Sequence, residues 1–215
     1  MQDKLKYLWS AMLLMAIVAF FFGFEEEAGT LIAFNVTPLL KRPGVVSMPG
    51  LKNYVAFIPE HFVKTSPAPV DKSDGVSCIL EGEFAFEGSM NFKYIDCGSR
   101  SVAHSSASQG EEGSMSFLQK GEFYHPGSRQ EATEFAAEVI NTPGILLTAD
   151  KEGRQIVIGQ PGDPVTIKCS SDLGKAATDA KGFTFTWEWD APVPAYYLKT
   201  PVDIAALKKL PSASE

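Results

Sequence analysis

The chain has 215 residues, of which 45% are hydrophobic and 21% charged, and its formal net charge is −7. This acidic balance argues against nucleic acid and against an anionic bilayer surface as binding partners, because both carry negative charge themselves. The length outside any membrane segment is enough for one ordinary domain or two small ones.

The first predicted element is a membrane-spanning helix over residues 7–24. This segment contains no charged residue, and at about 1.5 Å per residue it extends for roughly 27 Å, close to the thickness of bilayer hydrocarbon. A cleavable secretory signal is the alternative, since Lys4 and Lys6 precede the apolar run. The run is longer than a usual signal core and passes directly into Glu25 without a cleavage site of small residues, which favours an uncleaved anchor.

The basic residues around this span predict its orientation. Lys4 and Lys6 lie directly before it, whereas the next basic residues after it are Lys41 and Arg42. Because an excess of Lys and Arg marks the cytoplasmic side, residues 1–6 are expected in the cytoplasm. The C-terminal domain is then extracytoplasmic, and periplasmic if the source is bacterial.

The region after the span is expected to begin with a Pro-rich stalk or extended segment at residues 25–70, followed by a β-rich domain at residues 71–210. Within that domain, alternating runs at residues 77–86 and 90–97 predict a β-hairpin. Residues 101–113 are rich in Ser, Gly and Glu without apolar periodicity, which predicts an exposed loop.

The C-terminal half predicts strands around one amphipathic helix. That helix covers residues 129–141, with Ser128 as its N-cap and apolar residues at helical spacing. The other predicted elements are strands at residues 115–124, 145–149, 154–159, 165–169 and 182–189 and a short helix near residues 200–209. A turn at residues 150–153 joins two of these strands in a hairpin. Residues 211–215 are expected to form a disordered tail.

One disulfide, between Cys78 and Cys97, is suggested by the cysteine positions. In an oxidising compartment it would close a loop of about 20 residues and stabilise the fold by about 3 kcal/mol. The hairpin register leaves this open, since a two-residue turn places the two cysteines opposite each other. A three-residue loop instead pairs Phe84 with Phe92 and turns the two sulfurs to opposite faces. Cys169 is expected to be a small buried core residue.

The sequence predicts no catalytic residue, no cofactor site and no metal site. Its three histidines are far apart and lack the spacing of metal ligands. No phosphate-binding loop and no nucleophile elbow occurs. Three acidic residues could supply the paired carboxylates of a hydrolase, but the solvated face of an amphipathic strand explains them better. These residues are Glu81, Glu83 and Glu87.

Aromatic residues alternate along residues 183–189. Core packing is the first interpretation, because rings of this size bury a large area. An exposed aromatic binding face for a glycan or another ligand is the alternative. That face would consist of Trp187, Trp189, Tyr196 and Tyr197.

Together these features predict an α+β protein with a single N-terminal transmembrane helix, followed by a mostly antiparallel β-rich soluble domain of seven to nine strands that carries one packed helix. The expected function is that of a non-catalytic interaction subunit in a membrane or envelope assembly. Its expected partners are the lipid bilayer and other membrane or envelope proteins, with a homo-oligomer as one option. Ala19 and Gly23 are small residues at a spacing that permits close contact between membrane helices. The alternative is a membrane-tethered module that binds a ligand or glycan through the C-terminal aromatic residues.

Overall fold

The computed structural model describes residues 39–40, 43–44, 47–72, 76–176 and 178–208. The predicted anchor at residues 7–24, with Ala19 and Gly23, lies outside these residues, and so does the tail at 211–215. Among the residues described, no helix is long and apolar enough to cross a membrane.

The described chain is β-rich, with 45% of its residues in strands and 10% in helices, which confirms the predicted β-rich domain. Its strands are β1 (Tyr54–Pro59), β2 (Val63–Thr65), β3 (Ala68–Pro69), β4 (Ile79–Glu81), β5 (Ala85–Phe86), β6 (Lys93–Asp96), β7 (Ala103–Gln109), β8 (Ser116–Pro126), β9 (Gly144–Ala149), β10 (Gln155–Ile158), β11 (Thr166–Asp172), β12 (Gly182–Ala191) and β13 (Tyr196–Leu198). Its helices are η1 (Glu60–Phe62), α2 (Gln130–Val139) and α3 (Ile204–Leu207).

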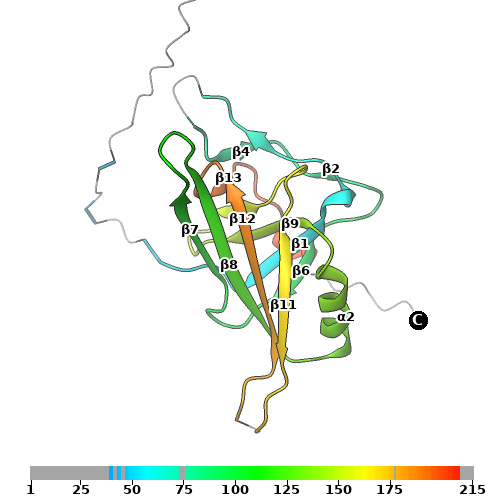
Figure 1. Cartoon of the computed structure of the whole chain (residues 1–215). Coiled ribbons are helices and arrows are strands. Elements are labelled where there is room, and N and C mark those ends of the chain that lie inside the picture. The colour runs from blue at the N-terminus through cyan, green and yellow to red at the C-terminus, as the bar shows by residue number, and fades with distance from the viewer. Residues whose placement is uncertain (1–38, 41–42, 45–46, 73–75, 177, 209–215) are drawn as a thin grey trace, which may run out of the picture. The chain divides into compact units, whose positions relative to one another are not determined.

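Two larger sheets organise these strands. One sheet has seven strands in the order β3-β4-β13-β10-β9-β1-β6, and the other has four in the order β11-β12-β8-β7. A small third sheet joins β2 to β5. The pairing is antiparallel throughout these sheets except between β13 and β4. In Figure 1 the long strands of the four-stranded sheet cross in front of the seven-stranded sheet.

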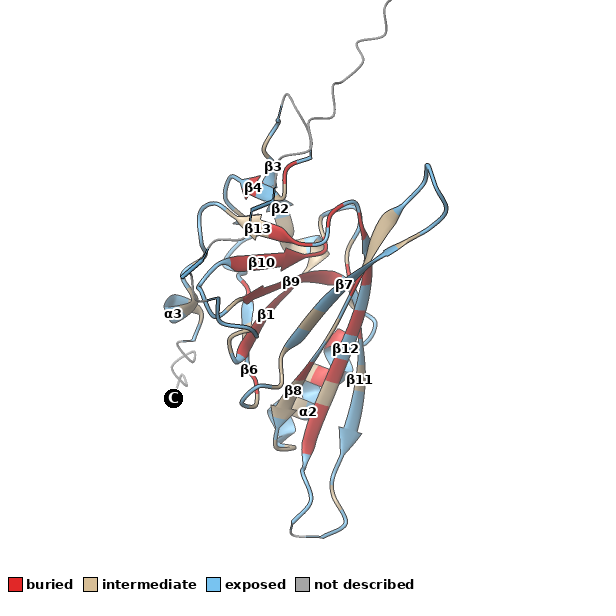
Figure 2. Ribbon diagram, turned by 90° about the vertical axis from the view of Figure 1, so that its left-hand side faces the viewer, coloured by how far each residue is buried: buried red, intermediate tan, exposed pale blue. Residues whose placement is uncertain are grey.

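A single core joins the two larger sheets. Along β12 the aromatic residues of the alternating run are buried, whereas Thr186 and Glu188 between them are exposed. This alternation turns one face of the four-stranded sheet towards the core, as Figure 2 shows by the red bands along β12. Trp189 on this face reaches Tyr196 of β13 in the other sheet, with ring centroids 6.2 Å apart. Apolar burial therefore holds the two sheets together.

Helix α2 fills one end of this core. Phe135 contacts Phe57 of β1 and Phe185 of β12, at centroid distances of 6.4 and 5.8 Å. The predicted helix is thus confirmed, but its N-cap is Arg129 rather than Ser128, and no side chain caps it. The short C-terminal helix α3 is capped as its sequence suggests, because the Asp203 carboxylate accepts hydrogen bonds from the first backbone amides.

The predicted hairpin between residues 77–86 and 90–97 is wrong. β4 pairs with β3 and β13, whereas β6 pairs with β1 and places Ile95 opposite Val55. An alternating pattern identifies a half-buried strand but does not identify its partner. β1 itself lies in the segment expected to be a stalk or extended segment, and its first five residues are buried in the seven-stranded sheet. The β-rich domain therefore begins well before residue 71.

The Cys78–Cys97 disulfide is not formed, and all three cysteines are free thiols. Cys78 immediately precedes β4 and Cys97 immediately follows β6, two strands that lie five steps apart in the sheet order. At about 4.8 Å per step this separates the two strands by roughly 24 Å, far beyond the reach of a disulfide. Cys97 is buried, whereas Cys169 is only half-buried rather than a full core residue.

Candidate functional site

β7 forms one edge of the four-stranded sheet, where the sequence predicted a loop. It pairs with β8 from Ala103 opposite Glu122 to Gln109 opposite Ser116. Five of its seven residues are exposed, so its sequence shows no apolar alternation. Backbone hydrogen bonds to β8, rather than side-chain burial, hold such an edge strand in place.

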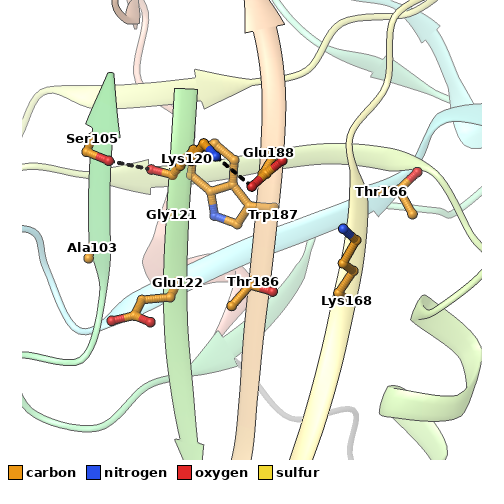
Figure 3. Close-up of a pocket in the computed structure, with 10 residues that line it drawn as sticks. All are labelled: Ala103, Ser105, Lys120, Gly121, Glu122, Thr166, Lys168, Thr186, Trp187 and Glu188. Atoms are coloured by element: carbon orange, nitrogen blue, oxygen red, sulfur yellow. Dashed lines mark hydrogen bonds and ion pairs between the residues drawn. The ribbon is translucent and has the colours of Figure 1, made fainter. Parts of the chain in front are cut away.

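The outer face of the four-stranded sheet carries an ordered set of polar side chains. Directly paired residues of neighbouring strands point to the same face, so the strand registers define rows across the sheet. One row is Ser105, Lys120, Glu188 and Thr166, and the next is Ala103, Glu122, Thr186 and Lys168. These eight residues, with Gly121 and Trp187, line a hollow of about 470 Å³ that we call the outer hollow (Figure 3).

The charges of the outer hollow are balanced. Lys120 Nζ lies 2.9 Å from Glu188 Oε1, and about half of each side chain is exposed. The hydrogen bond from Lys120 and its positive charge lower the pKa of the Glu188 carboxyl, and Lys168 adds to this effect. With Glu122, the hollow thus presents two cations and two anions of alternating sign. Such a surface suits a polar partner that offers both signs of charge.

Trp187 supports the outer hollow from beneath. It is only 4% exposed, and its indole packs against Gly121 so closely that a Cβ at that position would overlap the indole ring. On the same side of the sheet the ring stacks on His104, with centroids 5.6 Å apart and planes 22° apart. The absence of a side chain at Gly121 therefore allows a large aromatic ring to fill the space under the hollow.

His104 is held in one tautomer by a buried amide. The Gln119 side chain is fully buried, and its amide nitrogen donates a hydrogen bond of 2.9 Å to the Val193 carbonyl. Its oxygen is therefore the acceptor facing His104 Nε2 at 3.0 Å, so Nε2 carries the hydrogen. Burial lowers the pKa of His104, which keeps the ring neutral at pH 7.

A second hollow of about 420 Å³ lies on the inner side of β7, and we call it the inner hollow. Besides His104, it is lined by Arg154, whose Nε lies 2.7 Å from Asp150 Oδ2. The same guanidinium reaches Glu152 at 3.2 Å and stacks over the Tyr197 ring, 5.0 Å from its centroid. The charged groups of the inner hollow thus pair with one another. Fewer charged groups are left to bind a ligand there than in the outer hollow.

The aromatic binding face suggested by the sequence is not an exposed surface. Trp187, Trp189 and Tyr196 are 4%, 5% and 5% exposed and belong to the core. Tyr197 is half-buried under Arg154. Core packing, the first interpretation of the alternating aromatics, is confirmed, and a glycan platform built from these four residues is wrong.

The structure does not bring the histidines and the acidic strand residues into one site. His61 packs on the ring of Phe62, His104 lies on β7, and His125 Nδ1 is 2.7 Å from the Asp96 carbonyl oxygen. Within the described part of the chain, no group of three or more His, Cys, Asp or Glu side chains could hold a metal ion. Glu81 is exposed and pairs with Lys199.

Comparison of this chain with protein-family models, with curated proteins and with solved structures finds no match. No relative therefore supplies a function for transfer. The chemistry of the surfaces described above is what can indicate a function for this chain.

Proposed function

We propose that this chain is a single-pass membrane protein whose β-rich domain lies outside the cytoplasm and acts as a non-catalytic interaction subunit of a membrane or envelope assembly. The uncharged run at residues 7–24 supports the membrane anchor. Lys4 and Lys6 before that run support a cytoplasmic N-terminus. The packed helix α2 and the two sheets form the domain that the anchor holds at the membrane.

The outer hollow is the observation that carries the proposed contact role. Its side chains stand on neighbouring strands of one sheet, so their spacing is fixed before a partner arrives. A surface that is ordered in advance loses little conformational freedom on binding. Alternating Lys and Glu residues can pair with opposite charges on a protein and can reject surfaces of the wrong pattern.

A protein fits this surface better than a carbohydrate does. Carbohydrate sites commonly offer an exposed aromatic ring to a sugar face, but Trp187 lies beneath the strands here and is almost completely buried. The groups that remain accessible are the ammonium groups of Lys120 and Lys168, two carboxylates and small hydroxyls. Polar and charged groups of this kind make the hydrogen bonds and ion pairs of protein interfaces.

Crosslinking of the full chain in its native membrane, followed by affinity capture and mass spectrometry, tests this proposal. We expect a stoichiometric partner whose crosslinks involve the outer hollow. Lys120→Glu should reduce the capture of that partner by about tenfold, equivalent to about 1.4 kcal/mol, since it brings a third carboxylate beside Glu122 and Glu188.

Lys199→Glu is the matched control. Lys199 also forms an exposed ion pair, with Glu81, and its side chain is 57% exposed compared with 50% for Lys120. Equal loss of partner in both variants, or equal retention in both, would contradict a contact through the outer hollow. A chain that crosslinks to no other protein in its native membrane would contradict the proposed function as a whole.

A further inference from the structure

β7 is an edge strand without the usual protection against pairing. Exposed edges of natural sheets carry charges or proline, or are kept very short, because their free backbone groups can pair with another strand. β7 has seven residues, Ala-His-Ser-Ser-Ala-Ser-Gln, with no charged residue and no proline. No other strand of the described residues pairs with its outer side.

The other edges of the two larger sheets are protected. β3 has only two residues and ends in Pro69. β6 carries Lys93 and Asp96 within four residues, and β11 carries Lys168 and Asp172. This contrast marks β7 as the edge that is open to backbone pairing.

We propose that β7 pairs with β7 of a second copy of this chain, antiparallel around a two-fold axis at Ser106. The two four-stranded sheets then join into one continuous sheet of eight strands. This interaction goes beyond the proposed function, because pairing within the sheet plane leaves the outer hollow accessible to a different partner.

The sequence of β7 is compatible with itself in this register. The two-fold axis places Ser106 opposite its own copy, Ser105 opposite Ala107, His104 opposite Ser108 and Ala103 opposite Gln109. Identical strands that carried a charge near the axis would bring like charges together, which destabilises a cross-strand pair. β7 has no charge to repel its copy, and its small side chains do not obstruct the approach of a second strand.

Two-fold symmetry favours a second copy as the occupant of this edge. Because the same strand stands on both sides of the axis, each backbone pairing on one side of Ser106 is repeated on the other, as in the self-complementary interface of a symmetric dimer.

Disulfide trapping in the full chain, reconstituted in lipid nanodiscs or detergent micelles, tests the register. Ser106→Cys places two thiols directly opposite each other, at a Cα separation of about 4.5–5.5 Å, which a disulfide can bridge. Ser108→Cys is the matched control, since its two copies lie four positions apart, roughly 13 Å along the strand. The unmodified chain measures the background from its three native cysteines.

We expect a covalent dimer from Ser106→Cys and none above background from Ser108→Cys. A mixture of Ser105→Cys and Ala107→Cys chains should also crosslink, because these positions face each other. Equal crosslinking of Ser106→Cys and Ser108→Cys, or crosslinking of neither, would overturn the proposal.

Charge variants distinguish pairing through β7 from association of the membrane helices. Ser106→Lys brings two ammonium groups together at the axis and should reduce the dimer fraction at least about tenfold, whereas Ser106→Thr should preserve it. A dimer that persists in Ser106→Lys would overturn β7 as its interface, while capture of a different partner through the outer hollow would be unaffected.

Discussion

The indole of Trp187 packs directly against the backbone of Gly121, its cross-strand partner in the four-stranded sheet. An added methyl group at Gly121 would overlap both this indole and the carbonyl oxygen of Ala103 on β7. The glycine is therefore required by close packing rather than by an unusual backbone conformation. Through these two contacts, Gly121 links Trp187, which forms the floor of the outer hollow, to the edge strand β7.

Gly121→Ala is expected to destabilise the domain by about 1–3 kcal/mol, because the extra methyl forces the indole and β7 to move apart. Ser108→Ala, an exposed change on β7, should shift stability by less than about 0.5 kcal/mol. Thermal unfolding of the two variants, followed by tryptophan fluorescence, measures the difference. Equal stability of both variants would contradict the close packing of Trp187 on Gly121.

Trp187→Ala separates the core from the binding-face interpretation of the aromatic residues. Removing a buried aromatic side chain costs about 3–5 kcal/mol, so this variant should unfold at a much lower temperature or fail to fold. Lys168→Ala, on the opposite face of the same sheet, should fold normally. A stable Trp187→Ala protein that had lost only a ligand would support the aromatic platform instead.

The half-buried His104 predicts a loss of stability in mild acid. Burial lowers its pKa from the ordinary 6.5, so below about pH 6.5 the unfolded chain binds a proton more readily than the folded chain does. This contribution to stability is complete above pH 6.5 and is lost as the pH falls towards the folded pKa. Denaturant unfolding between pH 7.5 and 5 should therefore show a smaller acid loss for His104→Gln than for the unmodified chain. The same pH dependence in both proteins would contradict the assignment.

The thiol of Cys97 should be almost unreactive in the folded protein. Burial raises its pKa to about 12, compared with an ordinary value of 9.0, so its thiolate fraction at pH 8 falls by roughly 1,000-fold. Thiol titration should find Cys97 protected in the native chain and three free thiols in the unfolded, unreduced chain. One free thiol after unfolding, instead of three, would show that a disulfide exists.

Local patterns allowed several elements to be predicted. The alternation along β12 identified both the strand and its buried face, since burial on one face requires a period of two. The β9–β10 hairpin was predicted correctly because the turn that joins its strands is local, with Gly153 N donating to the Asp150 carbonyl at 3.1 Å. Asp150 also binds Arg154 across this turn.

Features that depend on distant partners could not be predicted. β6 pairs with β1 rather than with the nearer β4, because the choice depends on how the whole sheet packs. His104 and Gln119 belong to two different strands, and only the β7–β8 register brings them together. β7 itself was missed because backbone hydrogen bonds, which leave no side-chain pattern, hold this edge strand. The candidate site depends on pairing between distant strands as well as on local patterns. The outer hollow therefore could not be predicted from the sequence.

The proposed position of the domain outside the cytoplasm is the central claim, because the kind of partner that can reach the outer hollow depends on it. Trypsin added to intact spheroplasts or right-side-out vesicles measures it directly, since the exposed Lys175 between β11 and β12 offers a cleavage site. We predict cleavage of the domain in intact spheroplasts, with a membrane-bound N-terminal fragment retained. Protection of the domain until the membrane is lysed would place it in the cytoplasm and contradict the account.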